Sequence, residues 1–135
     1  LQAFVDSMVP RYGGDPQRTA LLGFSQGGSL AYRVALGTPG RYRGVAALST
    51  WMPPEAEEHA DLDGASRLPI LIQHGTEDPL VAVDRARDSR DRLVAMGLTP
   101  DYREYPMAHE IRPPSLGDLT QWLGQVLDLP EESDT

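Results

Sequence analysis

Residues 19–28 read TALLGFSQGG, and this stretch decides the fold that we expect. Thr19 to Phe24 is a short apolar run typical of a buried strand, and Gln26 to Leu36 has the pattern of a helix that ends at Gly37. Ser25 lies between them in a G-x-S-x-G pattern, with a strand before it and a helix after it. The pattern alone fits either an exposed serine nucleophile or a serine that merely caps the helix.

The neighbours of Ser25 fit the first of these roles. Gly23 and Gly27 would keep side chains from blocking the close approach of strand and helix. The backbone N–H of Gln26, at the start of the helix, would point at an oxyanion that develops beside the serine.

The rest of the chain continues the alternation of strands and helices. Strands are expected at 42–49, 68–74 and 101–105, helices at 1–9, 83–96 and 116–127, and an irregular segment at 51–67. In the helix at 83–96, Arg87 is expected to pair with Asp91, and Asp88 with Arg92. Apolar strands joined by helices indicate an α/β fold, a mostly parallel sheet with helices on both faces. Functional residues of such sheets gather just beyond the carboxyl ends of the strands.

The composition of the 135 residues excludes several kinds of chemistry. The chain has no Lys and no Cys, which excludes a P-loop or Schiff-base lysine, a disulfide and a cysteine nucleophile. Its 12 basic residues against 20 acidic ones, a net charge of −8, argue against a nucleic-acid partner. No apolar run reaches the roughly 18–20 residues that span a bilayer, so we expect no stable membrane insertion.

Two further polar groups follow predicted strands. Asp78 lies in a tight turn after the third strand and could orient a histidine, although the adjacent Glu77 is a rival for that role. His109 lies in a loop after the fourth strand. Ser25, Asp78 and His109 therefore occur in a known chain order of a nucleophile, acid and base, each at the same edge of the sheet.

The other two histidines fit structural roles better. His74 stands at the end of the third strand, and we expect it to pack or form a hydrogen bond under the acid turn. His59 lies in an acidic loop and is expected to be solvated. No residue set suggests a bound metal or an organic cofactor.

Four segments resemble the phospholipase/carboxylesterase family of α/β-hydrolase serine esterases, which includes the acyl-protein thioesterases. They are RTALLGFSQGG at 18–28, LSTWMP at 48–53, IQHGTEDPLV at 72–81 and MAHE at 107–110. The similarity runs from about Asp15 to Leu129. By matched position it implies that Ser25 is the nucleophile, Asp78 the acid and His109 the base. It also implies an acyl site lined by Trp51, Met52 and Leu80.

The chain departs from the family pattern at its start. Family members begin with further strands and a His-Gly-x-Gly-like loop that supplies a second oxyanion donor, and none of this precedes Leu1. We therefore expect residues 1–129 to be the C-terminal portion of an α/β-hydrolase domain, followed by an acidic tail at 130–135. The first strand should then be an exposed apolar edge of the sheet. The activity predicted below refers to the intact protein.

The sequence thus predicts a serine hydrolase that cleaves a small-molecule ester or acyl substrate through an acyl-enzyme on Ser25. The alternatives are a serine peptidase domain of the prolyl-oligopeptidase type and a non-catalytic hydrolase-like binding domain. A cytoplasmic location and a homodimer are further expectations.

Overall fold

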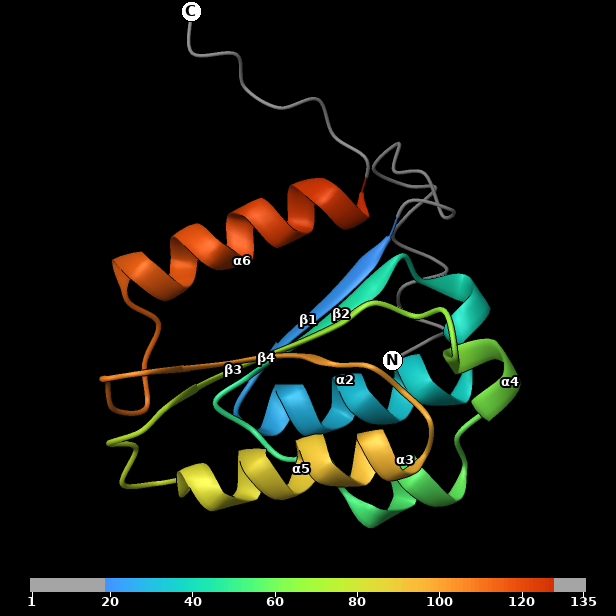
Figure 1. The fold of residues 1–135 in the computed structure, drawn as a ribbon, viewed down its shortest axis with the longest axis horizontal. Helices are drawn as coiled ribbons and strands as arrows, with labels where there is room; N and C mark the ends of the chain where they lie inside the picture. The colour runs from blue at the N-terminus through green and yellow to red at the C-terminus, as the bar shows by residue number, and fades with distance from the viewer. Residues whose placement is uncertain (1–18, 128–135) are drawn as a thin grey trace, which may run out of the picture.

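The computed structural model describes residues 19–127, which form a four-stranded sheet with helices on both faces (Figure 1). The strands are β1 (Ala20–Phe24), β2 (Gly44–Leu48), β3 (Ile70–Gly75) and β4 (Asp101–Tyr105). They lie in the order β1-β2-β3-β4, and each neighbouring pair is parallel, as the sequence predicts. The helix expected at 1–9 and the tail expected at 130–135 lie outside the described residues.

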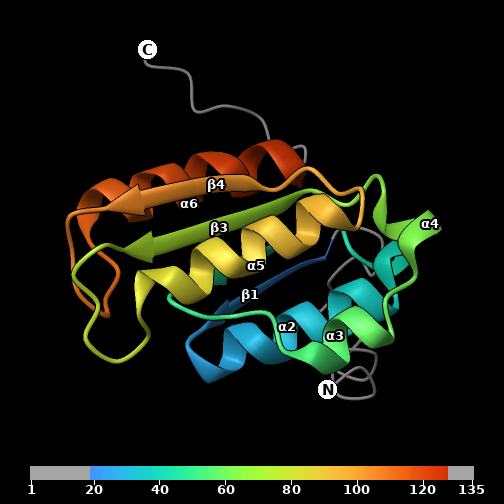
Figure 2. The ribbon, with the colours of Figure 1, turned by 60° about the horizontal axis from the view of Figure 1, so that its bottom comes forward.

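The two faces of the sheet are covered by different helices. Figures 1 and 2 show α2 (Gln26–Gly37) and α5 (Val83–Ala95) on one face and α6 (Pro113–Val126) on the other. Every residue of β2 and β3 is buried because helices cover both sides of these central strands. Alternate residues of β2 point to opposite faces, so Val45 joins the core under α2 and α5, whereas Leu48 packs with Trp122 of α6.

The segment that we expected to be irregular contains two short helices, α3 (Pro54–Glu58) and α4 (Leu62–Ala65). A proline fits the first turn of α3 because the amide of that turn needs no acceptor within the helix. The Asp61 carboxylate caps α4 by accepting the N–H of Gly64 at 3.2 Å. The expectation of no regular structure was therefore wrong here, since these helices are only about one turn long and have no apolar periodicity.

The helix α5 forms one of its two expected ion pairs. Arg92 lies 3.6 Å from Asp88, one turn earlier in the helix, as predicted. Arg87, expected to pair with Asp91, instead forms two hydrogen bonds of 2.7 and 2.9 Å with the Glu104 carboxylate of β4. The spacing of residues along a helix reveals only partners on the same helix. The bidentate pair of Arg87 with Glu104 on the neighbouring strand is stronger than a single ion pair with Asp91 would be. The bonds from Arg87 lower the pKa of Glu104 to about 2.

The outer strand β1 has only β2 beside it within residues 19–127. Leu22 and Phe24 of β1 are 52% and 39% exposed, so the expected apolar edge is present in this part of the chain. None of the helices in residues 19–127 is long and apolar enough to cross a membrane.

Candidate active site

Ser25 forms the turn between β1 and α2 in a backbone conformation that non-glycine residues rarely adopt. Its φ is 57° and its ψ is −123°. The turn is fixed by a hydrogen bond of 2.9 Å from the Ser25 N–H to the Leu48 carbonyl at the end of β2. The hydroxyl of Thr50 donates a second bond to the Ser25 carbonyl. Strained backbone held by such neighbours is typical of functional turns.

Two glycines near Ser25 allow α2 to pack closely against its neighbours. They are Gly23 and Gly28, whereas the motif predicts Gly23 and Gly27. A Cβ on Gly23 would lie 2.3 Å from the Gly27 carbonyl oxygen, so the expected close approach is confirmed at this position. A Cβ on Gly27 would meet no atom within 4 Å among the described residues. The second restricted position is Gly28, where a Cβ would lie 2.4 Å from the Thr50 side chain.

Asp78 is held in the turn after β3 by the backbone that follows it. Its Oδ1 accepts the N–H groups of Leu80 and Val81, both at 2.8 Å, while Oδ2 lies 2.7 Å from Nδ1 of His109. Burial by itself would raise the pKa of Asp78, but the hydrogen bonds from Val81, His109 and Leu80 outweigh it and leave the pKa lowered. Asp78 is therefore ionised at neutral pH. The rival Glu77 is exposed.

His109 joins the other two residues. Its Nε2 lies 3.1 Å from Oγ of Ser25, and its Nδ1 bonds to Asp78. The ring of Phe24 packs on the imidazole with the two centroids 4.8 Å apart. The structure thus brings together three groups separated by up to 84 positions in a continuous chain of hydrogen bonds. In such a chain an imidazole can accept the proton of a serine hydroxyl.

The loop that carries His109 rests directly on Gly75, the last residue of β3. A Cβ on Gly75 would lie 2.1 Å from the Met107 carbonyl oxygen and 2.4 Å from that of Ala108. Both obstacles are backbone atoms, so no side-chain rotation could relieve the contact. The Glu77 N–H also donates to the Met107 carbonyl at 3.0 Å, which fastens the two loops together.

We expect the substitution Gly75→Ala to displace His109 from Ser25. A misplacement of about 1 Å can cost roughly 10²-fold in rate, and we expect a loss of ester turnover of that order. The measurement is kcat of the variant beside Gly124→Ala, whose added Cβ would meet no atom within 4 Å among the described residues. Equal kcat values for the two variants would show that the Gly75 contact does not position His109.

The remaining histidines have the roles expected of them. His74 is fully buried, and its Nε2 lies 2.7 Å from the Val81 carbonyl in the acid turn, which confirms the predicted hydrogen bond. His59 is exposed. Within residues 19–127, no group of three His, Asp or Glu side chains is placed to hold a metal ion.

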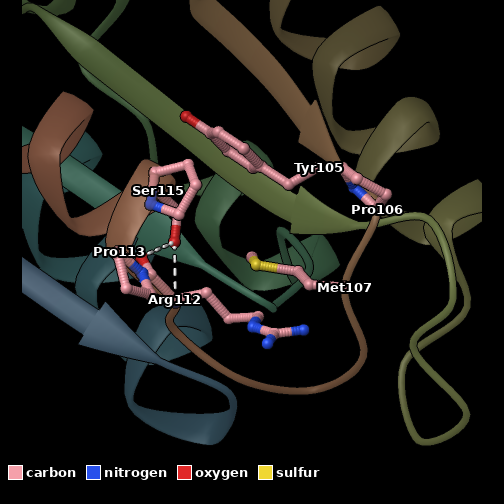
Figure 3. A pocket seen from close by; sticks show the side chains of 7 residues that line it. Tyr105, Pro106, Met107, Arg112, Pro113 and Ser115 are labelled. Atoms are coloured by element: carbon pink, nitrogen blue, oxygen red, sulfur yellow. Dashed lines mark hydrogen bonds between the residues drawn. The ribbon is translucent and has the colours of Figure 1, made fainter.

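The loop that carries His109 and the segment after β2 each line a hollow. One, of about 320 Å³, lies between the end of β4 and the start of α6, and Figure 3 shows six of its lining residues labelled. The other, of about 380 Å³, is lined by the segment after β2 and by α5, and it includes Trp51 and Met52. Arg85 lies 4.2 Å above the Trp51 ring there. Leu80 is 74% exposed and lines neither hollow. Its backbone N–H donates a hydrogen bond to the Asp78 carboxylate.

Sequence reasoning missed three residues that shape this centre. Phe24 contacts the His109 ring, Thr50 bonds the Ser25 carbonyl, and Gly75 admits the His109 loop. Thr50 lies just beyond the end of β2, so the rule that picked out Asp78 and His109 could have found it. Nothing in the sequence indicates the contact between Phe24 and His109, because it depends on how the His109 loop folds over the end of β1.

Comparisons with known proteins agree with this geometry. The profile of the phospholipase/carboxylesterase family matches residues 1–127. Acyl-protein thioesterase 1 of Cryptococcus neoformans var. neoformans serotype D is 35% identical over 147 residues, an alignment that covers 94% of this chain and 58% of the relative. Carboxylesterase SOBER1 of Arabidopsis thaliana is 29% identical, with 94% of this chain and 56% of the relative covered.

A solved structure shows the same fold. The crystal structure of Arabidopsis thaliana SOBER1 superposes with a TM-score of 0.79 at 27% identity, covering 93% of this chain and 60% of that one. The chain spans about half the length of the curated relatives that it matches. Its parallel sheet and helices are those of an α/β-hydrolase, and the chain belongs to the phospholipase/carboxylesterase family.

Proposed function

We propose that this protein is a serine hydrolase that cleaves carboxylic esters through an acyl-enzyme intermediate. The observation that carries the proposal is the hydrogen-bond chain from Asp78 through His109 to Ser25, with links of 2.7 and 3.1 Å. The names of the relatives, a thioesterase and a carboxylesterase, support an acyl ester or thioester as the substrate class.

In the proposed mechanism, His109 takes the proton of the Ser25 hydroxyl as the oxygen attacks the ester carbonyl. The ionised Asp78 holds His109 in the tautomer with its proton on Nδ1, which leaves Nε2 free to accept. His109 then protonates the leaving alcohol or thiol, and the acyl group stays on Ser25. A water molecule, activated by the same histidine, hydrolyses that ester and frees the serine.

Charge on the carbonyl oxygen would be stabilised by the start of α2. Gln26 is the first residue of this helix, so its N–H has no acceptor one turn earlier. The Ser25 N–H is already bound to the Leu48 carbonyl. We therefore assign one oxyanion donor to the Gln26 amide, aided by the positive end of the helix dipole.

The acyl chain would lie against the hollow that holds Trp51 and Met52. Trp51, Met52 and Pro54 give this hollow an apolar wall, and its place after β2, the strand beside β1, supports this assignment. The contribution of Leu80, the homodimer and the cytoplasmic location stay predictions from the sequence. The net charge of −8 supports the absence of a nucleic-acid partner.

We expect the full-length protein to hydrolyse p-nitrophenyl butyrate and a fatty-acyl thioester faster than a peptide anilide of any length. The reason is that an alcohol oxygen or a thiol sulfur leaves more readily than an amide nitrogen. The measurement is kcat/KM for the three substrates, with Ser25→Ala as the blank. Preferential cleavage of the anilide would favour the peptidase alternative, and no turnover of any substrate would favour a binding domain.

A further inference from the structure

His74 is a second histidine beside Asp78, and the proposed mechanism does not use it. It lies on β3 with its side chain fully buried. Its Nε2 lies 2.7 Å from the carbonyl oxygen of Val81 and 3.5 Å from Oδ2 of Asp78. Both neighbours are hydrogen-bond acceptors, so Nε2 carries the proton.

The other nitrogen of this ring lies in a different environment. Nδ1 is buried and has no hydrogen-bond partner among the described residues. A proton there would be a buried donor without an acceptor, which is costly. We therefore describe His74 as a hydrogen-bond donor through Nε2, aimed at the acid turn.

The bond to Val81 matters because the same residue also holds the acid. The Val81 N–H donates to Oδ1 of Asp78, while the Val81 carbonyl accepts from His74. His74 thus ties the turn to the central strand at the residue that supplies the carboxylate with one of its two amide donors. The distance of 3.5 Å from its Nε2 to Oδ2 adds a direct contact with the carboxylate.

We propose that His74 is a positioning residue for the hydrolytic reaction, which fixes the orientation of the Asp78 carboxylate by anchoring the turn that binds it. The proposal rests on the proposed function of the Ser25 centre. It goes beyond the three residues of that centre, since His74 contacts Val81 and Asp78 and acts through Asp78.

Loss of the His74 donor has a predictable effect on pH dependence. A looser turn would let the Asp78 carboxylate move away from His109, and it would then stabilise a protonated His109 less strongly. The other charged groups on this face are Glu104, the register partner of His74 on β4, and Arg87 of α5, and these two are bound to each other. Asp84, at the start of α5, lies 3.5 Å from Arg87.

The test compares His74→Gln with His74→Asn in the full-length protein. The Gln amide nitrogen reaches about as far as Nε2 and can still donate to Val81, whereas the shorter Asn side chain cannot. We expect His74→Asn to lower kcat by roughly 10–10²-fold with little change in KM, because a misplaced acid weakens the chemical step more than binding. We expect the acidic limb of its kcat/KM profile to move to lower pH, and His74→Gln to keep most of the activity and the original profile.

Three outcomes would overturn the proposal. In the first, His74→Asn keeps the wild-type kcat and pH profile. In the second, it loses thermal stability, yet its correctly folded sites, counted by fluorophosphonate titration, turn over at the wild-type rate. In the third, folded His74→Gln is as impaired as His74→Asn. The exposed His59→Gln is the matched control and should be unchanged. Failure of the proposed function is distinct, since the wild-type protein itself would then show no turnover.

Discussion

Replacing Ser25 with alanine is expected to abolish ester turnover by the full-length protein, with kcat falling by about 10⁶-fold, as for loss of the serine in other triads. The Ser25 hydroxyl lies 3.1 Å from His109 Nε2 and is the group that would form the acyl-enzyme. Its removal leaves the backbone bond to Leu48 intact, so the turn and the fold should persist. The measurement is hydrolysis of p-nitrophenyl butyrate, with circular dichroism to check the fold.

The matched control for this change is Ser29→Ala. Ser29 lies one turn further along α2, and its hydroxyl donates to the Gln26 carbonyl at 2.9 Å. It has no contact with His109, so its loss should leave turnover unchanged. Retained activity in Ser25→Ala, or equal losses in the two variants, would remove Ser25 from the role of nucleophile.

The second large effect is expected for Asp78→Asn, with a loss of about 10⁴-fold in kcat, the cost of the equivalent change in a serine protease. The Asn oxygen can still accept the N–H groups of Leu80 and Val81 in the place of Oδ1. Its NH₂ group would then face Nδ1 of His109 and donate to it. The imidazole would be forced into the tautomer with its proton on Nε2, which cannot accept the proton of Ser25.

Glu77→Gln is the control for the choice of carboxylate. Glu77 is adjacent in sequence but exposed, and its backbone N–H, which the substitution retains, provides the bond to Met107. We expect little change in kcat. A severe loss in Glu77→Gln combined with a mild one in Asp78→Asn would mean that the acid of this centre is Glu77.

The four strands, the longer helices between them and the meeting of Ser25, Asp78 and His109 could be predicted because each depends on local pattern. Apolar runs marked β1, β2 and β3, and the positions just after strands marked Ser25, Asp78 and His109. Parallel strands bring such residues to one edge whatever the details of packing. The steric role of Gly23 was equally local, since it concerns the strand and helix that flank one turn.

What the sequence could not supply are contacts between segments. Arg87 pairs with Glu104 because α5 packs on the sheet beside β4, a neighbour that helical spacing does not reveal. Thr50 leaves no room for a side chain at Gly28, and the His109 loop leaves none at Gly75. These neighbours are far apart in the sequence, so no motif describes them. The short helices α3 and α4 depend on capping and on a proline at the first turn, and so lack a periodic signal.

The most direct test of the central claim is mass spectrometry of the full-length protein after treatment with a fluorophosphonate probe. The account predicts one covalent adduct on the tryptic peptide 19–33, with fragment ions that place it on Ser25 and not on Ser29. The adduct should be lost in Ser25→Ala and should form more slowly in Asp78→Asn. A protein that takes up no label, or carries it on another serine, would contradict the assignment of Ser25 as the nucleophile.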